Sequence, residues 1–254
     1  MVGRVVEVRA RTYARTWRAS VFSSFVNPAL LLGAMGLGLG TLVDAASLGS
    51  AGPVGYLQFI APGLLAANAM QTAASESAWP VLGGLKWTRS YPTALATPIS
   101  VGDLTAGHLI WTGVRIFQVS LVFAGVAILL GGMPAAAGLA GVLPATLCGL
   151  AFAGPITWFT LFTMSETALS AMFRLFVIPV FLFSGTFFPI DRLPDWIQPV
   201  VPLTPLWHGV ELTRSITTDI ETAWPAVLHL AVLVIVGAAG AAGTHRLMRR
   251  RLLV

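Results

Sequence analysis

The sequence predicts an all-α membrane protein with six transmembrane helices and both termini in the cytoplasm. Three observations lead to this prediction. Apolar residues make up 56% of the 254 residues and charged residues only 10%, whereas soluble domains carry about 25% charge. Six apolar stretches reach the roughly 20 residues that a helix needs to cross a bilayer. The basic residues collect on one predicted side of these stretches, which fixes the orientation of the chain.

The six predicted spans are separated by short polar or proline-rich connections. They cover, in order, about 21–43, 57–79, 104–131, 137–162, 167–188 and 223–245. Prolines interrupt some of them, at Pro28, Pro62, Pro144, Pro155 and Pro179. A membrane bundle tolerates such prolines because neighbouring helices satisfy the freed carbonyl groups.

The distribution of charge orients the predicted spans. Of fifteen lysines and arginines, eleven fall in the N-terminal segment, the connection 80–103 and the C-terminal tail. The segment 187–222 instead carries five acidic residues against two arginines. Because basic residues stay on the cytoplasmic side, both termini are expected inside and 187–222 outside. We therefore expect a multi-pass protein of the cytoplasmic (inner) membrane.

Residues 1–20 are expected to form a separate amphipathic helix lying in the plane of the lipid headgroups. Its polar residues recur at steps of three and four, and its apolar residues form the opposite stripe. These are Arg4, Glu7, Arg11, Arg15 and Arg18 on one side, and Val2, Val6, Ala10, Tyr13 and Trp17 on the other. Two interpretations stay open: a flank that only sets topology, or an elbow helix that also contacts a partner.

The segment 187–222 is too apolar for a free linker and too rich in proline for one long helix. We expect short amphipathic helices, arranged as a hairpin on the outer leaflet. The residues singled out in it are Pro189, Asp191, Pro194, Trp196, Pro205 and His208. A structural cap on the bundle and a role in release of cargo are both open.

Motifs for catalysis are absent from the sequence. It has no G-x-x-x-x-G-K-[ST] loop for nucleotide phosphates, no H-E-x-x-H motif and no G-x-S-x-G elbow. With four histidines and one cysteine, a zinc site is not expected. The paired carboxylates Asp191 and Asp195 flank a proline and are expected to be solvated. The arginines flank apolar runs, which points to anionic lipid headgroups and against a nucleic-acid partner.

Two arginines, Arg115 and Arg174, lie within predicted spans, nearer their cytoplasmic ends. Snorkelling to the interface is the simpler interpretation, since a charge in hydrocarbon costs roughly 2.5–3.5 kcal/mol on insertion scales. The alternative is pairing with Glu76 or Glu166, which would hold an inner gate closed. His229 is the only candidate for a proton relay, and a lone histidine more often makes a helix–helix contact, so proton-coupled transport is disfavoured.

Two stretches resemble a known family. Residues 76–115, ESAWPVLGGLKWTRSYPTALATPISVGDLTAGHLIWTGVR, are similar to the cytoplasmic coupling region of type-2 ABC exporter permeases. The similarity is to the branch of nodulation-oligosaccharide and daunorubicin exporters. Residues 181–196, FLFSGTFFPIDRLPDW, and 205–214, PLWHGVELTR, resemble the family's signature at the end of the fifth span and its extracellular hairpin. This chain has Trp207 where the family often has serine or threonine, which is expected to adjust how the hairpin sits in the leaflet.

The resemblance implies that residues 21–254 are a six-span permease domain. Two permeases, identical or paralogous, would pair, and each would dock a separate ABC ATP-binding subunit that binds ATP and Mg²⁺; this chain would bind no cofactor. A coupling helix is expected at about 80–100. The docking and coupling residues implied are Glu76, Lys86, Trp87, Arg89, Tyr91, Thr97, Pro98 and Asp103. Membrane lipids and an amphiphilic small molecule are the other expected partners.

The expected function is the non-catalytic permease subunit of an ATP-driven exporter of a drug, lipid, polyketide or saccharide conjugate. The side chains proposed to line the substrate path are Phe176, Phe181, Phe183, Phe187 and Phe188. Three alternatives remain. A membrane-embedded lipid-modifying enzyme would normally show clustered carboxylates or histidines, and a secondary transporter an inverted repeat. A scaffold or sensor subunit without transport is the third.

Overall fold

The structure, a computed structural model, describes residues 1–38, 55–218, 220 and 222–252. Over these residues it is entirely helical. The elements are α1 (Val2–Tyr13), α2 (Trp17–Leu32), the π-helix η1 (Gly33–Gly38), α3 (Tyr56–Lys86), α4 (Ser90–Leu95), α5 (Val101–Leu129), α6 (Ala135–Thr163), α7 (Glu166–Met172), the π-helix η4 (Phe173–Val177), α8 (Ile178–Phe183), the 3₁₀ turns η5 (Ile190–Arg192) and η6 (Val201–Leu203), α9 (Pro205–Thr217) and α10 (Ala226–Leu252).

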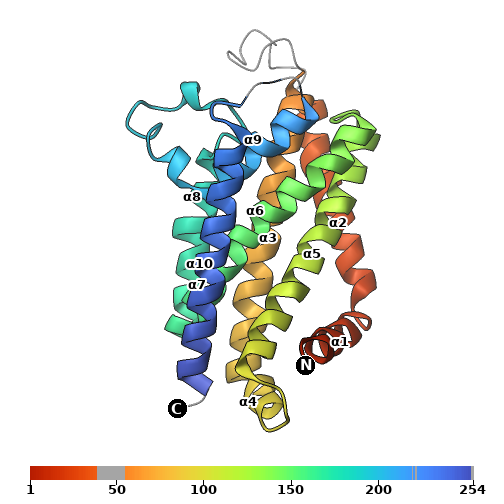
Figure 1. Cartoon of the computed structure of the whole chain (residues 1–254). Helices are drawn as coiled ribbons and strands as arrows, with labels where there is room; N and C mark the ends of the chain where they lie inside the picture. The colour runs from red at the N-terminus through yellow and green to blue at the C-terminus, as the bar shows by residue number, and fades with distance from the viewer. Residues whose placement is uncertain (39–54, 219, 221, 253–254) are drawn as a thin grey trace.

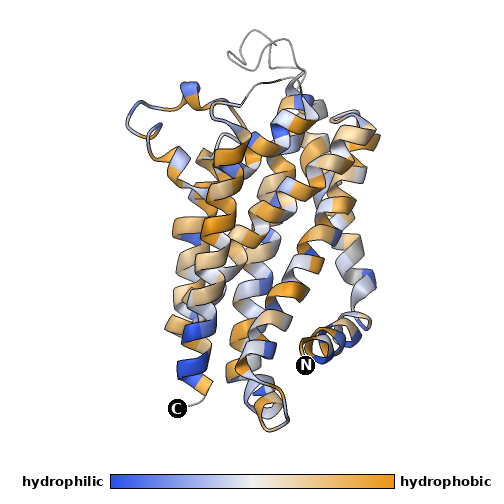
Figure 2. Cartoon of the chain, viewed as in Figure 1, coloured by the Kyte–Doolittle hydropathy of each residue, from blue (hydrophilic) through white to orange (hydrophobic). Residues whose placement is uncertain are grey.

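The long helices run side by side as a bundle, with both chain termini and α4 at one end (Figure 1). We call this end the terminal end. Helix α9 lies at the opposite end, and α1 lies across the terminal end rather than along the bundle (Figure 1). Hydrophilic residues concentrate on α1 and on the last turns of α10, whereas the middle of the bundle is mostly hydrophobic (Figure 2). This banding is what a bilayer requires of a protein that crosses it.

Four helical stretches in the described residues are long and apolar enough to cross a membrane. They are α5, α6, the continuous run α7–η4–α8 and α10. Each corresponds to a predicted span, with ends that differ from the prediction by at most seven residues. The first predicted span, 21–43, covers most of α2 and all of η1, and its last residues lie outside the described part of the chain.

Helix α3 corresponds to the second predicted span but is not among these four, although it has 31 residues. It is the central helix, packed against α5, α6 and α9. Every residue from Phe59 to Ala67 is buried, so this part of the helix is enclosed on all sides. Since it contacts protein rather than solvent or lipid there, small residues such as alanine and glycine suit it better than large apolar ones.

Small residues bring α6 and α10 into backbone contact. A Cβ atom on Gly154 would lie 2.6 Å from the Ala241 amide nitrogen, and one on Gly240 would overlap the ring of Pro155. The hydroxyl of Thr244 donates to the carbonyl of Gly154 across the same interface at 2.8 Å. The small residues of α10 therefore serve packing within the chain.

Replacing Gly240 by alanine is expected to destabilise the protein by about 1–3 kcal/mol, because the new methyl group has no space beside Pro155. The matched control is Gly125→Ala in α5, where an added Cβ atom has no neighbour within 4 Å. Thermal unfolding of the two variants in one detergent measures the difference. Equal melting temperatures for both variants would contradict this account of the α6–α10 contact.

Three boundaries differ from the sequence prediction. The N-terminal helix ends at Tyr13, and Trp17 already belongs to α2, because the chain turns there from lying across the bundle to running along it. The predicted coupling helix 80–100 is not one helix: residues up to Lys86 continue α3, and only Ser90–Leu95 form a separate helix. The last span extends to Leu252, so the C-terminal arginines continue the helix as its final turns.

Candidate functional site

The corner between α3 and α4 is determined by a short run of residues. The amides of Trp87 and Thr88 both donate to the carbonyl of Gly83, at 3.0 and 2.9 Å, which ends α3. Arg89 adopts φ 50°, in the left-handed region, and the chain then turns into α4. Gly84 is required here because a Cβ atom would overlap the ring of Tyr91. The corner is thus folded back tightly against the end of α3.

Tyr91 fixes α4 to the rest of the terminal end. Its side chain is buried in an apolar cluster that includes Val5 of α1, Leu104 of α5 and Met248 of α10. Arg9 of α1 donates to its hydroxyl at 2.5 Å. Burial raises the pKa of Tyr91, and the Arg9 guanidinium opposes this shift. Tyr91, predicted as a docking residue, therefore acts inside the chain, where it joins four helices.

Other predicted docking residues are on the surface of the corner. Trp87 is 57% exposed. The remaining exposed members of the set are Lys86, Arg89, Thr97 and Pro98. Asp103 closes a capping box with Ser100 at the start of α5, so its contacts support the helix end.

Arg115 is the centre of a polar cluster between α1, α3 and α5. Its Nε donates to Glu76 at 3.1 Å and its Nη1 to the side chain of Gln118 at 2.9 Å. Gln118 in turn donates to the hydroxyl of Tyr13 at 3.0 Å, and the guanidinium lies 4.1 Å from the centre of the Tyr13 ring. Of the two interpretations, the pairing of Arg115 with Glu76 is present in the structure.

The surroundings of Arg174 differ from those of Arg115. It is exposed, and within the described residues it forms no hydrogen bond or ion pair. The predicted pairing with Glu166 is wrong, because Glu166 lies 3.2 Å from Lys86 instead. Since the helical run ends at Phe183, Arg174 lies halfway along it, eight residues after Glu166 and nine before Phe183. It also lies in the π-helical turn η4.

The five predicted lining phenylalanines divide into two groups. Phe176 and Phe183 are 46% and 40% exposed on the outside of the α7–α8 run. Phe181 and Phe187 contact each other edge to face at 5.1 Å and pack against the core. Phe188 packs on the buried cluster of Leu193, Val201 and Trp207. Only the first two are available at the surface of the single chain.

A buried arginine holds the opposite end together, and the sequence analysis missed it. Arg214 of α9 donates to the carbonyl of Gly185 at 2.9 Å and lies over the ring of Phe59 of α3, 4.1 Å from its centre. Burial lowers the pKa of Arg214 to about 10, and the charge of Glu211, 3.5 Å away, opposes this shift. The sequence signal that could have pointed to this buried arginine is the R of ELTR at 211–214.

His229 is not the lone histidine that the sequence suggested. It is the fourth residue of α10, at the end of the bundle opposite the terminal end. Its Nδ1 is 2.8 Å from Nδ1 of His208. The Nε2 of His208 must donate to the carbonyl of Pro202, 2.9 Å away, because a carbonyl only accepts. In neutral His208, Nδ1 therefore accepts from His229, and burial lowers the pKa of His208. The rings of Trp207 and Trp224 enclose the pair.

The rest of the predicted hairpin is partly buried. Asp191 and Asp195 are exposed, as predicted, and so are Pro194 and Trp196, the latter at 75%. Pro189 and His208 are buried, and Pro205 is half-buried at the start of α9. Trp207 is buried as well, which corrects the expectation that it adjusts the hairpin in the leaflet. The segment is therefore anchored to the bundle through α9.

Comparisons with known proteins agree with this architecture. The sequence profile of the ABC-2 type transporter family matches residues 5–217. The chain belongs to this family. Nodulation protein J of Rhizobium leguminosarum bv. viciae is 28% identical over 242 residues, which cover 92% of this chain and 88% of that protein. Nodulation protein J of Bradyrhizobium diazoefficiens is 27% identical over 248 residues, covering 93% and 90%. That of R. leguminosarum bv. trifolii is 30% identical over 208 residues, covering 78% and 74%.

As an ABC-2 type transporter, the chain is a membrane protein that acts as the transmembrane subunit of an ABC transporter. Members of this family work with an ATP-binding partner. Permeases of this family are typically non-catalytic, and the sequence of this chain contains no enzymatic motif. Within the described residues, no three histidine, cysteine, aspartate or glutamate side chains come together as a metal site.

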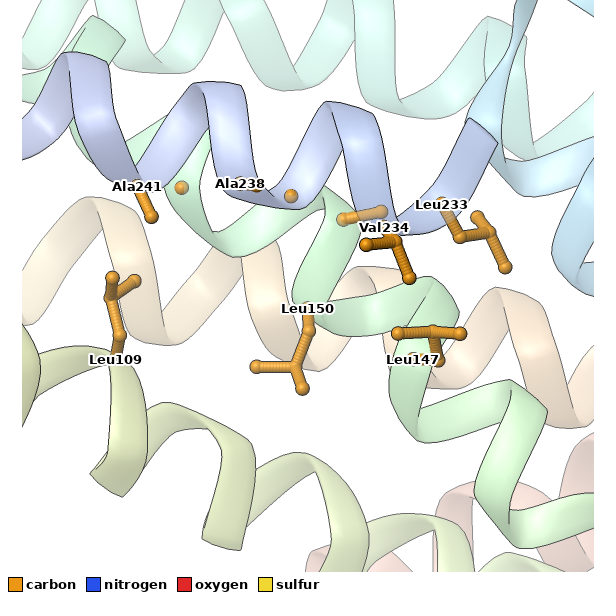
Figure 3. A pocket seen from close by; sticks show the side chains of 10 residues that line it. Leu109, Leu147, Leu150, Leu233, Val234, Ala238 and Ala241 are labelled. Carbon is orange, nitrogen blue, oxygen red and sulfur yellow. The ribbon is translucent and has the colours of Figure 1, made fainter. Parts of the chain in front are cut away.

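A shallow apolar groove crosses the outside of this transporter between α5, α6 and α10. Its volume is about 270 Å³. Leu109 lines it from α5, Leu147 and Leu150 from α6, and Val234 and Ala238 from α10 (Figure 3). The labelled side chains in this view are all aliphatic, so the groove offers no hydrogen bond or charge to a ligand. It suits ordinary lipid chains and has no feature that would select a cargo.

Proposed function

We propose that this chain is the permease subunit of an ATP-driven exporter, which moves an amphiphilic molecule out of the cytoplasm with energy from a separate ATP-binding subunit. In this proposal six spans cross the membrane: α2–η1, α3, α5, α6, α7–η4–α8 and α10. The terminal end faces the cytoplasm, with α1 as an elbow helix at the headgroups. Two permease copies pair, and the cargo passes along their interface.

Charge supports this topology. The terminal end carries α1, the turn into the first residues of α2, the α3–α4 corner and the last turns of α10, which together contain eleven of the fifteen basic residues. Basic residues of this kind are retained on the cytoplasmic side. The two remaining candidate spans also have sufficient length. Helix α3 has 31 residues, or about 46 Å at the usual helical rise, and α2 with η1 covers 22 residues.

The exposed Trp87 on a rigid corner is the observation that carries the docking proposal. A large aromatic side chain at the centre of a protein interface contributes more binding energy than most other residues. Lys86 and Arg89 lie beside it and add charge complementarity for an acidic partner surface. Because the buried Tyr91 joins α4 to α1, α5 and α10, a push on the corner would move these helices together.

The α7–α8 run is the proposed wall of the cargo path. It contacts the bundle through a narrow stripe that includes Leu169, Val177 and Val180, and it exposes the opposite side. Phe176 and Phe183, partly exposed at the edge of the stripe, offer flat apolar surface to a lipid-like or polyketide-like molecule. In a permease dimer this side would face the second copy across the path.

Purification of the tagged chain from its native host in mild detergent tests the proposal. We expect an ATP-binding protein to co-purify in equal amount, and reconstituted vesicles to transport amphiphiles only when ATP is present. A chain that purifies alone and transports without ATP would overturn the proposal in favour of a secondary transporter. Turnover of a lipid substrate by the isolated chain would point instead to a membrane-embedded enzyme.

A further inference from the structure

The chain places two arginines within its membrane-spanning helices, and their surroundings differ sharply. Arg115 is buried, with a side chain only 9% exposed, and it pairs with Glu76 and Gln118. Arg174 is exposed and has no such partner among the described residues. The first arginine therefore has a structural explanation within the chain, and the second does not.

The position of Arg174 makes exposure to plain lipid costly. It lies halfway along the α7–η4–α8 run, about 12 Å from the start of α7 at the usual helical rise. A guanidinium facing hydrocarbon at such depth costs roughly 2.5–3.5 kcal/mol on insertion scales, and more on an isolated helix. Ionisable residues at this depth usually face a polar cavity, another charge or a transport path.

The local helix geometry turns this arginine outward among apolar side chains. The π-helical turn η4, FRLFV, interrupts the α-helix at Phe173–Val177, and such turns occur frequently at functional sites. Leu175, next to Arg174 in the chain, is 78% exposed, and Ile178, four residues after Arg174 and on the same face of the helix, is 49% exposed. A single cation is thus surrounded by apolar surface, a combination that fits a ligand with one anionic group and an apolar body.

We propose that Arg174 binds an anionic group of the cargo while Leu175 and Ile178 hold the cargo's hydrophobic part. The cargo would be an amphiphile with a phosphate, sulfate or carboxylate, since a guanidinium binds these groups through two parallel hydrogen bonds. This inference rests on the proposed function and narrows its substrate class from amphiphiles in general to anionic ones. The groove between α5, α6 and α10 is not this site, because it has no charged group.

Equilibrium binding to the purified chain, in nanodiscs of neutral phosphatidylcholine, tests the inference without an ATP-binding partner. Radiolabelled dodecyl phosphate is compared with dodecyl maltoside, which has a chain of the same length and no charge; empty nanodiscs give the background. We expect Arg174→Gln to weaken dodecyl phosphate binding at least tenfold and to leave dodecyl maltoside unchanged. Arg174→Lys, which keeps the charge, should retain most of the affinity.

The control is Arg249→Gln, which removes an equally exposed arginine from the last turns of α10. It should bind both probes as the unchanged chain does. Equal dodecyl phosphate binding by Arg174→Gln and the unchanged chain would overturn the inference, and so would an equal loss in Arg249→Gln. Because Arg174 has no partner in the fold, its variants should elute from size exclusion as the unchanged chain does; Arg174→Lys serves as the folded reference.

A second arm separates cargo from resident lipid. If phosphatidylglycerol added to the nanodiscs at ordinary membrane content displaces dodecyl phosphate, Arg174 binds a membrane lipid and the cargo assignment is overturned. If binding persists, the cargo assignment is supported. The proposed function is judged separately, because Arg174-dependent binding without ATP-driven transport would contradict the exporter and not the anion site. ATP-driven transport without Arg174-dependent binding would contradict the anion site and not the exporter.

Discussion

Replacing Trp87 by alanine is expected to weaken docking of the ATP-binding subunit by roughly 30-fold or more and to uncouple ATP hydrolysis from transport. The reason is that a central interface tryptophan typically costs about 2 kcal/mol or more when truncated. Trp87 is 57% exposed at the α3–α4 corner, so its loss removes no packing from the core. Arg89→Glu reverses a charge beside it and is expected to have the same direction of effect. Co-purification and ATP-driven transport in vesicles measure both.

The matched control is Trp17→Ala at the start of α2. Trp17 is 47% exposed and lies near the same end, yet it is outside the corner. It should leave partner binding and transport as they are. If Trp87→Ala and Arg89→Glu both keep normal complex formation and transport, the docking assignment is wrong. Loss of membrane insertion in either variant would also contradict it, because the proposal gives these residues no role in the fold.

Patterns that depend on the bilayer could be read from the sequence. Four of the six predicted spans appear as long apolar helices with ends close to those expected, because the length of an apolar run is set by membrane thickness. Prolines 28, 62, 144 and 155 lie inside helices, as the tolerance of bundles for proline implies. The break between the second and third predicted spans falls within the predicted connection 80–103, since its glycines and polar residues interrupt an otherwise apolar pattern.

Features that depend on tertiary contacts could not be read from the sequence. Trp87 and Tyr91 are four residues apart and equally aromatic, yet one is exposed and the other buried, and only the packing of α1 on α4 decides which. His208 and His229 are in separate helices, so no local spacing indicates that they touch. Arg214 lies in the predicted outer hairpin, and no local pattern indicated that it would also contact a backbone carbonyl and a ring distant in the sequence.

The choice between Glu76 and Glu166 as partner of Arg115 is a further case of this kind. Both acids lie near the same end of their helices, and the sequence allowed either. In the structure Arg115 pairs with Glu76, because α3 and α5 are neighbours there. Glu166 forms an ion pair with Lys86 instead. Tyr13 of α1 also lies over Arg115, so α1, α3 and α5 share one cluster.

Replacing Arg115 by methionine is expected to destabilise the protein by about 3 kcal/mol, because breaking a largely buried ion pair leaves Glu76 without its counter-charge. The side chains of Arg115 and Glu76 are only 9% and 21% exposed, so water replaces the lost partner poorly. The side-chain oxygen of Gln118 also loses its hydrogen-bond donor, and the Tyr13 ring loses the cation above it. Thermal unfolding in detergent measures the effect. Arg174→Met is the control at similar depth, and it should unfold at nearly the normal temperature because it breaks no contact in the described chain.

A double-mutant cycle with Glu76→Gln separates the ion pair from the rest of the cluster. If the pair itself carries the stability, Arg115→Met and Glu76→Gln together should cost less than the sum of the single variants, with a coupling energy of about 1–3 kcal/mol. Additive effects would show that the two side chains do not depend on each other, which would contradict the cluster as the link between α1, α3 and α5. A coupled result has a consequence for transport as well. Because the pair joins α5 to α3 and Arg115 also contacts the Tyr13 ring of α1, weakening it should let α1 move independently of α3, so ATP hydrolysis would continue while transport falls.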